Sequence, residues 1–277
     1  LEHHGSPAQQ AMYLPKLVSG EWSGTMNLTE PAAGSDVGAL RSTAEPIETG
    51  EHAGKYRITG QKIYITWGEH DLARNIIHLV LARLPGAPEG SRGISLFVVP
   101  KYHVNADGSL GPKNDLRCVS LEHKLGINAS PTCVMSYGDN GECIGELVGQ
   151  PNKGLAAMFT MMNNARINVG NQGAQIAERA TQQALAYARD RVQSARAGSP
   201  DKSPVAIIEH PDVRRMILRM KALTEGVRAL LYYCAGQVDR GNLGDEAARA
   251  RGEIVVPLIK AWGTDVGVEV SGLGIQI

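Results

Sequence analysis

The sequence predicts an α+β protein in which an antiparallel β-barrel-like middle domain precedes an incomplete C-terminal helical bundle of the four-helix type. Two changes along the chain carry this prediction. Between about residues 25 and 146, short apolar runs alternate with clusters of Gly, Pro, Asn and Asp, as is typical of short antiparallel strands. After the segment "GQPNKG" at 149–154 the apolar period becomes 3.6, and three long amphipathic helices follow, one fewer than a four-helix bundle needs.

The order of these patterns predicts three regions. Residues 7–18 are expected to be the end of a helix that starts further upstream, so residues 1–25 are assigned to the remnant of an N-terminal helical domain. The middle β domain is expected at residues 26–148 and the helical bundle at residues 149–277. The final "GVEVSGLGIQI" continues a helical pattern without a stop signal. We therefore expect a chain that is truncated at both ends.

The β region contains several strand candidates. The segment "KYRITGQKIYIT" at 55–66 gives two short runs on either side of Gly60 and Gln61, which favours a hairpin. The segments "IIHLVLARL" at 76–84 and "GISLFVVP" at 93–100 are β-branched runs bounded by Gly and Pro. Shorter candidates are "PTCVMSYG" and "IGELVG". Their spacing favours an antiparallel sheet or barrel over βαβ units.

Each of the three helices is predicted from apolar and small residues at helical spacing. The second helix begins at Pro211 and Asp212, a typical helix start, and Pro257 in the third is expected to mark a kink or a late start. The three stripes are Ala165, Val169, Gly173, Ile176, Ala180, Ala184 and Tyr187; Val213, Met216, Ile217, Met220, Leu223, Val227, Leu230, Cys234 and Val238; and Ile254, Leu258, Trp262, Val266, Val270 and Leu273.

Composition excludes several classes of function. Lys plus Arg and Asp plus Glu number 28 each, so no net charge favours nucleic acid or an anionic membrane surface. No apolar run is long enough to span a membrane, and the first ten residues lack the apolar core of a signal peptide. The four Cys show no metal-binding spacing with one another or with His. We therefore expect no metal site, reduced thiols and a cytoplasmic location.

The segment "TMNLTEPAAGSDVG" at 25–38 has two interpretations. In the first it is an ordinary turn, because Pro31 fixes its backbone angle, Gly34 permits a positive one, and Ser35 and Asp36 bond back to the local backbone. In the second it is a loop whose N–H groups and hydroxyls hold a large polar ligand at close approach. The residues of this segment alone leave both open.

Four segments taken together resemble the acyl-CoA dehydrogenase family in order and spacing. They are "NLTEPAAGSD", "GQKIYITWG", "EHKLGINAS" and the long run that begins "NKGLAAMFTMMNNARINVGNQ". Within the family the chain is most similar to the branch of 3-methylmercaptopropionyl-CoA dehydrogenases, on "YLPKLVSGEWSGTMNLTEP", "ASPTCVMSYGDNG" and "IIEHPDVRRM". The resemblance covers essentially the whole chain and implies FAD as the cofactor.

The resemblance also implies which residues meet the flavin. Thr29 would meet the polar edge of the isoalloxazine ring, Ser35 would lie near the pyrophosphate and the thioester arm of the substrate, and Thr66 would bond flavin N5. Tyr64 stands where the family often has Trp, so it keeps an aromatic cover for the ring without the indole; an ordinary buried strand Tyr is the alternative. The implied cofactor residues of the two segments are Met26, Asn27, Leu28, Thr29 and Ser35, and Tyr64, Ile65 and Thr66.

Three residues of the helical region are implied by the same resemblance. Arg166, with Asn163 before it, lies where the family lines its acyl-CoA cleft, and Ser35 is assigned to substrate as well. A salt bridge inside the bundle is the alternative for Arg166. Arg191 matches an Arg that reaches the FAD of a neighbouring subunit, which implies a dimer or tetramer; a solvated cation at a helix end is its alternative.

The family reaction removes the α-proton of an acyl thioester with a carboxylate base while the β-hydrogen leaves as hydride. Most members place the Glu in a late segment, just past the point where this chain stops. A minority place it one residue before the cleft Arg, where this chain has Ala165. No catalytic residue is therefore assigned, and neither Glu30 nor Glu269 is promoted to the role. The expected function is FAD-dependent acyl-CoA oxidation, with an electron-transfer flavoprotein as acceptor; the alternative is a flavin- or acyl-CoA-binding module without turnover.

Overall fold

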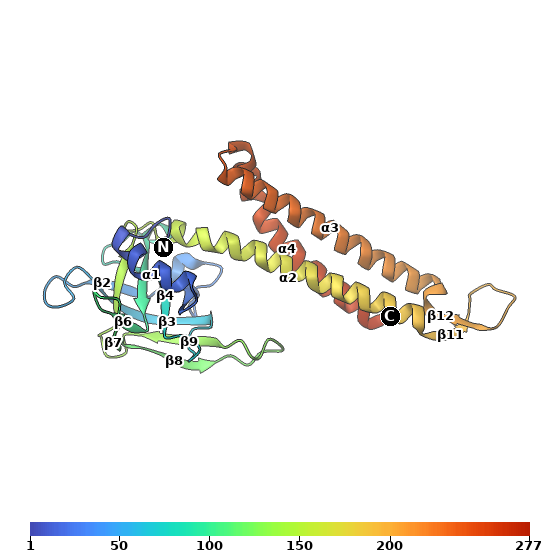
Figure 1. Cartoon of the computed structure of the whole chain (residues 1–277), viewed down its shortest axis with the longest axis horizontal. Helices are drawn as coiled ribbons and strands as arrows, with labels where there is room; N and C mark the ends of the chain where they lie inside the picture. Colours follow the sequence, from blue (N-terminus) through green and yellow to red (C-terminus); the bar gives the residue numbers. More distant parts are fainter. The chain divides into compact units, whose positions relative to one another are not determined.

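The computed structural model describes residues 1–277, which divide into two compact units, residues 1–160 and 161–277 (Figure 1). The α+β class predicted from the sequence is confirmed, because a β-rich unit precedes three long helices. The elements of the first unit are α1 (Pro7–Val18), β1 (Trp22–Asn27), η1 (Val37–Ala39), β2 (Thr43–Pro46), β3 (Tyr56–Thr66), β4 (Asn75–Arg83), η2 (Gly90–Gly93), β5 (Ile94–Pro100), β6 (Tyr102–Val104), β7 (Leu110–Lys113), β8 (Leu116–Leu121), β9 (Thr132–Tyr137) and β10 (Ile144–Val148).

The main sheet of the first unit is almost closed into a barrel. Its strands follow the order β1-β4-β5-β10-β3-β9-β8, and β2 pairs with both β3 and β4, which joins two strands that lie apart in that order. Most neighbours are antiparallel, but β1 runs parallel to β4. Strands β4 and β5 are buried along nearly their whole length, so the core of the unit lies around them. The edge strand β1 leads directly into the loop that carries the predicted ligand-binding residues.

The hairpin predicted at residues 55–66 is wrong. Strand β3 is one continuous strand of 11 residues. Gly60 lies in it because a Cβ there would be 2.2 Å from the hydroxyl oxygen of Ser42 on the neighbouring chain segment. The glycine is therefore required for a close approach between two segments, not for a turn.

Helix α1 also differs from its prediction. Ser6 accepts a hydrogen bond from the backbone N–H of Gln9, the Gln9 side chain accepts one from the backbone N–H of Ser6, and Pro7 occupies the first helical position. This capping box begins the helix inside the chain, so residues 7–18 are not the end of a longer helix. Its position packs Tyr13 against Trp22 at the start of β1, with ring centroids 6.3 Å apart.

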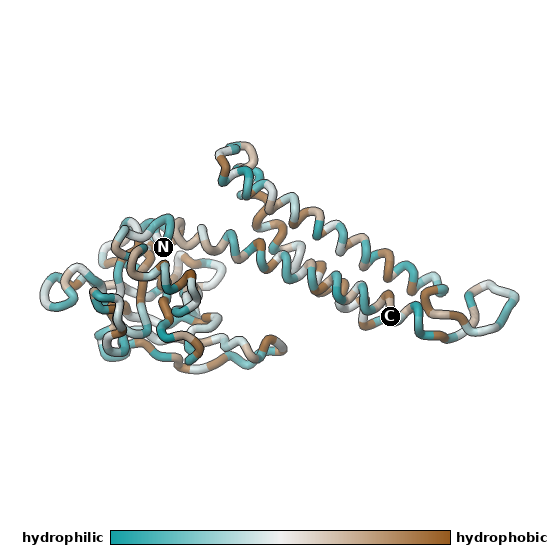
Figure 2. Tube along the Cα trace, viewed as in Figure 1, coloured by the Kyte–Doolittle hydropathy of each residue, from teal (hydrophilic) through white to brown (hydrophobic).

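The second unit is built from three long helices, as predicted. It contains most of α2 (Gly154–Asp190), which begins in the first unit, then α3 (Pro211–Asn242) and α4 (Glu246–Gln276). A small hairpin of β11 (Val192–Ala195) and β12 (Pro204–Ala206), followed by η3 (Ile207–Glu209), links α2 to α3. Figure 2 shows apolar residues recurring among polar ones along α3, as expected for an amphipathic helix. The buried residues of α3 include Met216, Met220, Val227 and Cys234 from its predicted stripe.

The predicted stripe of α4 is wrong in its first half. Ile254, Leu258 and Trp262 are 66%, 53% and 38% exposed, and the buried face instead carries Gly252, Val256, Ile259, Gly263, Val266, Gly267 and Val270. Glycines determine which face of α4 is buried. Gly263 lies against the backbone of α2, because a Cβ on it would be 2.8 Å from the carbonyl oxygen of Gly170. Pro257 is accommodated inside the helix rather than at a late start.

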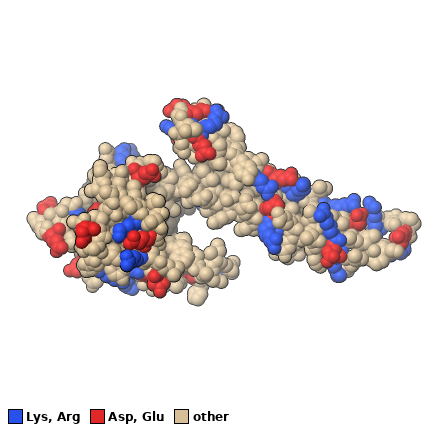
Figure 3. Space-filling view, in the orientation of Figure 1, with Lys and Arg blue, Asp and Glu red and all other residues tan.

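None of the helices combines the length and the apolar composition that crossing a membrane requires. In the face drawn in Figure 3, basic and acidic side chains are interspersed over both units. This face shows no continuous patch of one charge.

Candidate functional site

The segment from Leu28 to Ser42, here called the 28–42 loop, leaves the end of β1 and returns to the start of β2. Glu30 and Ala33 exchange backbone hydrogen bonds of 2.9 and 3.0 Å, which closes a tight turn over Pro31 and Ala32. A Cβ on Gly34 would lie 3.5 Å from the Thr29 methyl carbon, so the turn folds back beside Thr29. The turn interpretation and the ligand-loop interpretation are therefore compatible, because the turn shapes the loop.

A bulge in β3 brings the second predicted segment to the loop. Lys62 pairs with Met135 and Ile65 with Cys133, so three steps along β3 match two along β9, and Tyr64 adopts a φ of +60°. The extra residue reverses the inward and outward alternation: Lys62 and Ile65 both face the core, while Tyr64 and Thr66 face outward. The backbone N–H of Ile63 donates to the carbonyl oxygen of Thr29 at 2.9 Å, which joins β3 to the 28–42 loop.

The predicted cofactor residues fall into an exposed group and a buried group. Tyr64 is 60% exposed and Met26 is 39% exposed, and Ser35 and Thr66 are exposed as well. The side-chain hydroxyls of Thr29, Ser35, Tyr64 and Thr66 make no hydrogen bond within the protein, which leaves them available to a ligand. Asn27 and Ile65 are instead buried in the first unit, so only their backbones are available for such contacts.

Asn27 belongs to a buried chain of hydrogen bonds. The Tyr137 hydroxyl donates to Asn27 Oδ1 at 2.7 Å, Asn27 Nδ2 donates to Thr25 Oγ1 at 2.7 Å, and Thr25 Oγ1 lies 2.7 Å from His78 Nδ1. The Thr25 hydroxyl has one proton and two lone pairs, so it can hydrogen-bond both the Asn27 amide and the His78 ring. His78 Nε2 has no partner. Burial, together with the nearby charge of Lys101, lowers the pKa of His78 to about 3, so the ring is neutral at physiological pH.

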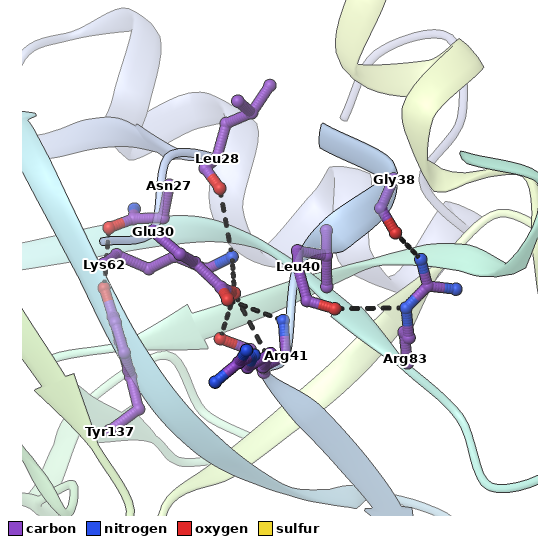
Figure 4. Close-up of polar contacts among 10 residues, drawn as sticks. Asn27, Leu28, Glu30, Gly38, Leu40, Arg41, Lys62, Arg83 and Tyr137 are labelled. Atoms are coloured by element: carbon purple, nitrogen blue, oxygen red, sulfur yellow. Dashed lines mark hydrogen bonds and ion pairs between the residues drawn. The ribbon is translucent and has the colours of Figure 1, made fainter. Parts of the chain in front are cut away.

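A buried ion pair connects the loop with β3. Lys62 and Glu30 are 0% and 6% exposed, and Lys62 Nζ lies 2.8 Å from Glu30 Oε1 (Figure 4). Burial alone would raise the pKa of Glu30, but the Lys62 ammonium and hydrogen bonds from Arg41 and Ser42 outweigh it and hold that pKa below its ordinary value. Neither residue is among the site residues predicted from the sequence. The partners are 32 residues apart in the chain, and the sequence contains no local pattern that pairs them.

The remaining predicted residues lie in the second unit. Arg166 is half-buried on α2, and its Nη1 donates to Asn163 Oδ1 at 3.0 Å, so the two predicted substrate residues contact each other. Arg191 follows the end of α2 and lines a depression of about 610 Å³ with Ser194 and His210. Its guanidinium donates to the Gln193 side chain at 3.1 Å and is otherwise exposed.

The carboxylates considered as a catalytic base are engaged elsewhere. Glu30 accepts from Lys62, Arg41 and Ser42, and Glu269 on α4 is paired with Arg219. A depression of about 1130 Å³ lies elsewhere on the first unit and contains none of the predicted site residues. Its lining mixes acidic residues such as Asp115 with basic residues such as Arg57.

Comparisons with known proteins agree on one family. The family profile described as acyl-CoA dehydrogenase, middle domain, matches residues 25–139, and the profile described as acyl-CoA dehydrogenase, C-terminal domain, matches residues 152–277. Among solved structures, PigA with FAD and proline is similar with a TM-score of 0.78 at 24% identity, covering 99% of this chain and 62% of that one. At this identity the similarity shows the fold alone.

Two curated relatives are more similar in sequence. The 3-methylmercaptopropionyl-CoA dehydrogenase of Ruegeria pomeroyi is 57% identical over 277 residues, which cover 99% of this chain and 46% of the relative. A butyryl-CoA dehydrogenase of Syntrophomonas wolfei is 44% identical, covering 96% of this chain and 45% of the relative. The chain thus spans about half the length of the curated relatives it matches.

Proposed function

Because the chain belongs to the acyl-CoA dehydrogenase family of FAD-dependent oxidoreductases, we propose that the intact protein oxidises an acyl-CoA thioester to the trans-2-enoyl-CoA. The intact protein here means the longest natural chain that contains these residues. The single observation that supports the proposal most is that the 28–42 loop and the segment from Tyr64 to Thr66, both of which carry exposed side chains, meet beside the Ile63–Thr29 hydrogen bond. FAD, when bound, supplies the acceptor for the β-hydrogen, which leaves as hydride.

The residues present fit a flavin. A flavin ring needs donors along its polar edge and an apolar or aromatic cover, and the two segments provide both. Thr29, Ser35 and Thr66 have hydroxyls that no protein atom uses, and Met26 and Tyr64 offer exposed apolar surface beside them. In the proposal Thr29 holds the polar edge of the ring, Thr66 donates to the nitrogen that receives the hydride, and Ser35 orients the substrate thioester.

The second unit supplies the acyl-CoA cleft and contacts between subunits in this proposal. Asn163 holds the guanidinium of Arg166, and this ordered pair would line the cleft. Arg191 would reach the FAD of another subunit in a dimer or tetramer. The acceptor of the electrons is proposed to be an electron-transfer flavoprotein, as the family resemblance implies.

We assign the catalytic base to a residue outside these 277. Ala165 has no group that accepts a proton, Glu30 is enclosed by its donors, and Glu269 is paired with Arg219. The chain's own contribution to the reaction is therefore to bind and orient the cofactor and the substrate.

The intact protein tests the proposal directly. We expect it to bind FAD with the visible spectrum of a bound flavin and to form enoyl-CoA from a short- to long-chain acyl-CoA panel with an artificial electron acceptor. The 277-residue chain supplied with FAD should form enoyl-CoA about 10²–10⁴-fold more slowly or not at all, as expected when a general base is missing. A folded intact protein that takes up no FAD contradicts the proposal. One that binds FAD and acyl-CoA without turnover is instead the non-dehydrogenating module.

Replacing Thr66 by Val separates a flavin contact from a structural role. The hydroxyl has no protein partner and Val is equally compatible with a strand, so the melting temperature should stay unchanged. Loss of a buried hydrogen bond to the flavin costs about 1–3 kcal/mol, or roughly ten- to a hundredfold in the rate of flavin reduction by acyl-CoA. Stopped-flow absorbance measures this rate. Thr59→Val, also exposed and on β3, is the control and should leave the rate unchanged. Equal rates for both variants would contradict a hydrogen bond between Thr66 and the flavin.

A further inference from the structure

The Glu30–Lys62 pair occupies the point where the 28–42 loop meets β3. Lys62 Nζ donates to Glu30 at 2.8 Å and to the carbonyl oxygen of Leu28 at 3.2 Å. The next residue of β3, Ile63, donates from its backbone to Thr29 at 2.9 Å. Two consecutive residues of one strand thus hold three consecutive residues of the loop.

The same carboxylate also holds the far end of the loop. Glu30 Oε2 accepts the backbone N–H of Arg41 at 2.6 Å, and Oε1 accepts the backbone N–H and the hydroxyl of Ser42 at 3.1 and 2.6 Å. Figure 4 shows the Lys62 side chain reaching Glu30 and Leu28 together, with the Arg41 backbone on the other side of the carboxylate. One side chain therefore closes the loop, and its partner attaches the closed loop to β3.

A second cation holds the part of the loop between these points. The Arg83 guanidinium donates to the carbonyl oxygens of Gly38 and Leu40, the second at 3.2 Å (Figure 4). Ala32 and Gly34 to Asp36 lie outside all these contacts and are exposed. The loop is thus held at both ends and presents its middle outward.

Stability alone does not account for a pair buried in this way. Removing two charges from water is costly, and an apolar pair of similar size is often at least as stable. What an apolar pair lacks is direction, because only the ammonium and the carboxylate can hold the carbonyl of Leu28 and the amides of Arg41 and Ser42 at defined distances.

We infer that Glu30 and Lys62 are positioning residues, which register the 28–42 loop against Tyr64 and Thr66 and so determine how tightly the flavin is held. The inference rests on the proposed function for its ligand, but the registration itself is a property of the protein without flavin. Lys62 lies just before the bulge that turns Tyr64 and Thr66 outward. The ion pair and these two outward side chains therefore depend on the same short stretch of backbone.

The decisive variant replaces both members together. Glu30→Gln with Lys62→Met leaves no buried charge unpaired and keeps an acceptor for one of the two amides, so the melting temperature should stay near that of the wild type. The attachment to Leu28 is nevertheless lost. In the intact protein we expect the dissociation constant for FAD to rise at least tenfold, and in flavin-free protein we expect the amides of Arg41 and Ser42 to exchange hydrogen at least tenfold faster.

The control removes a pair of the same charge from the same unit. Lys55 Nζ lies 3.2 Å from Glu146 Oε1 in a half-exposed pair away from the loop. Lys55→Met with Glu146→Gln should change neither FAD binding nor the exchange of Arg41 and Ser42. Ser42→Ala provides a milder test if the first double variant folds poorly, because it removes only the hydroxyl donor to Glu30; it should raise the dissociation constant severalfold.

The outcomes separate the inference from the proposed function. Wild-type FAD affinity and wild-type exchange in Glu30→Gln with Lys62→Met, or in Ser42→Ala if that double variant does not fold, would overturn the inference. Faster exchange with weaker FAD binding in the tested variant supports it. A wild-type protein that binds no FAD contradicts the proposed function, and in that case the amide exchange of the flavin-free variants still decides whether the pair registers the loop.

Discussion

Mild acid should weaken the first unit well before its carboxylates titrate, because His78 is buried in its neutral form. Between about pH 6.5 and pH 3 the unfolded chain binds a proton at this imidazole and the folded chain does not, so stability falls as the pH falls. The limiting slope for one group is about 1.4 kcal/mol per pH unit, and the loss between pH 6.5 and 5 is about 1.5 kcal/mol. The contribution of His78 to the slope falls to half at about pH 6.5 and has nearly disappeared by about pH 7.5.

The structure explains why the folded imidazole resists its proton. His78 is 0% exposed, so water cannot solvate a charged ring, and Lys101 and His70 disfavour a further positive charge nearby. A protonated ring donates from both nitrogens, and Nε2 has no acceptor in the structure. The acid form is therefore disfavoured by burial and by this unpaired N–H.

His78→Asn measures this effect, because the Asn side chain can still hydrogen-bond Thr25 and has no proton to gain. We expect the variant to be less stable at pH 7, owing to the lost ring, and to lose less stability than the wild type between pH 6.5 and 5. Burial also lowers the pKa of His70 and His103, so a smaller pH dependence remains. Urea unfolding followed by the fluorescence of Trp22 and Trp67, in a Trp262→Phe background, reports on the first unit. The exposed His123→Asn is the control and should keep the wild-type pH dependence. Parallel curves for wild type and His78→Asn would contradict the assignment.

The second large effect concerns the crossing of α2 and α4. A Cβ on Gly173 would be 2.0 Å from the carbonyl oxygen of Gly263, and one on Gly267 would be 3.1 Å from the backbone of Gly173. The two helices thus touch backbone to backbone, with no flexible side chain that could move aside. We expect Gly173→Ala to destabilise the second unit by about 3 kcal/mol or more, at the upper end of the range for overpacked sites.

The sign of the change identifies its cause. Helix propensity alone favours Ala over Gly by about 1 kcal/mol, so an uncrowded glycine should respond in the opposite direction. Gly236 on α3 has no atom within 4 Å of the position of a Cβ. Gly236→Ala is therefore expected to raise the melting temperature while Gly173→Ala lowers it by several degrees. Calorimetry of both variants gives the comparison, and a stabilised Gly173→Ala would show that the helices can separate without cost.

The sequence predicted elements where local pattern and packing agree. The change of period near residue 150 located both the β region and the helices, because alternation and the 3.6 repeat reflect burial on one face. The turn is wrongly predicted at Gly60 because a glycine between two strand-like runs usually marks a turn. The actual reason for this glycine is the close approach of Ser42, which is distant in the chain. The face of α4 was misread because glycines were not counted as core residues, although a helix that touches another backbone buries them.

The candidate site was predicted in part for the same reason. Ser35, Tyr64 and Thr66 are exposed and Thr29 is half-buried, and all four have hydroxyls without protein partners, which suits the role that the resemblance implies. Asn27 and Ile65 fall within the predicted segments, but their side chains belong to the core. The Glu30–Lys62 pair could not be predicted, because a buried ion pair between distant segments has no signature in either one.

The bulge in β3 has a consequence for how the protein can change over evolutionary time. In a regular strand Lys62, Tyr64 and Thr66 would share one face, and a substitution that altered a ligand contact would also disturb the barrel interior. Because of the extra residue, Lys62 and Ile65 pack in the core, while Tyr64 and Thr66 lie on the surface. Substitutions at Tyr64 and Thr66 can therefore change the contacts with a ligand and leave the packing of the core intact. Ligand specificity and stability can thus evolve independently along a single strand.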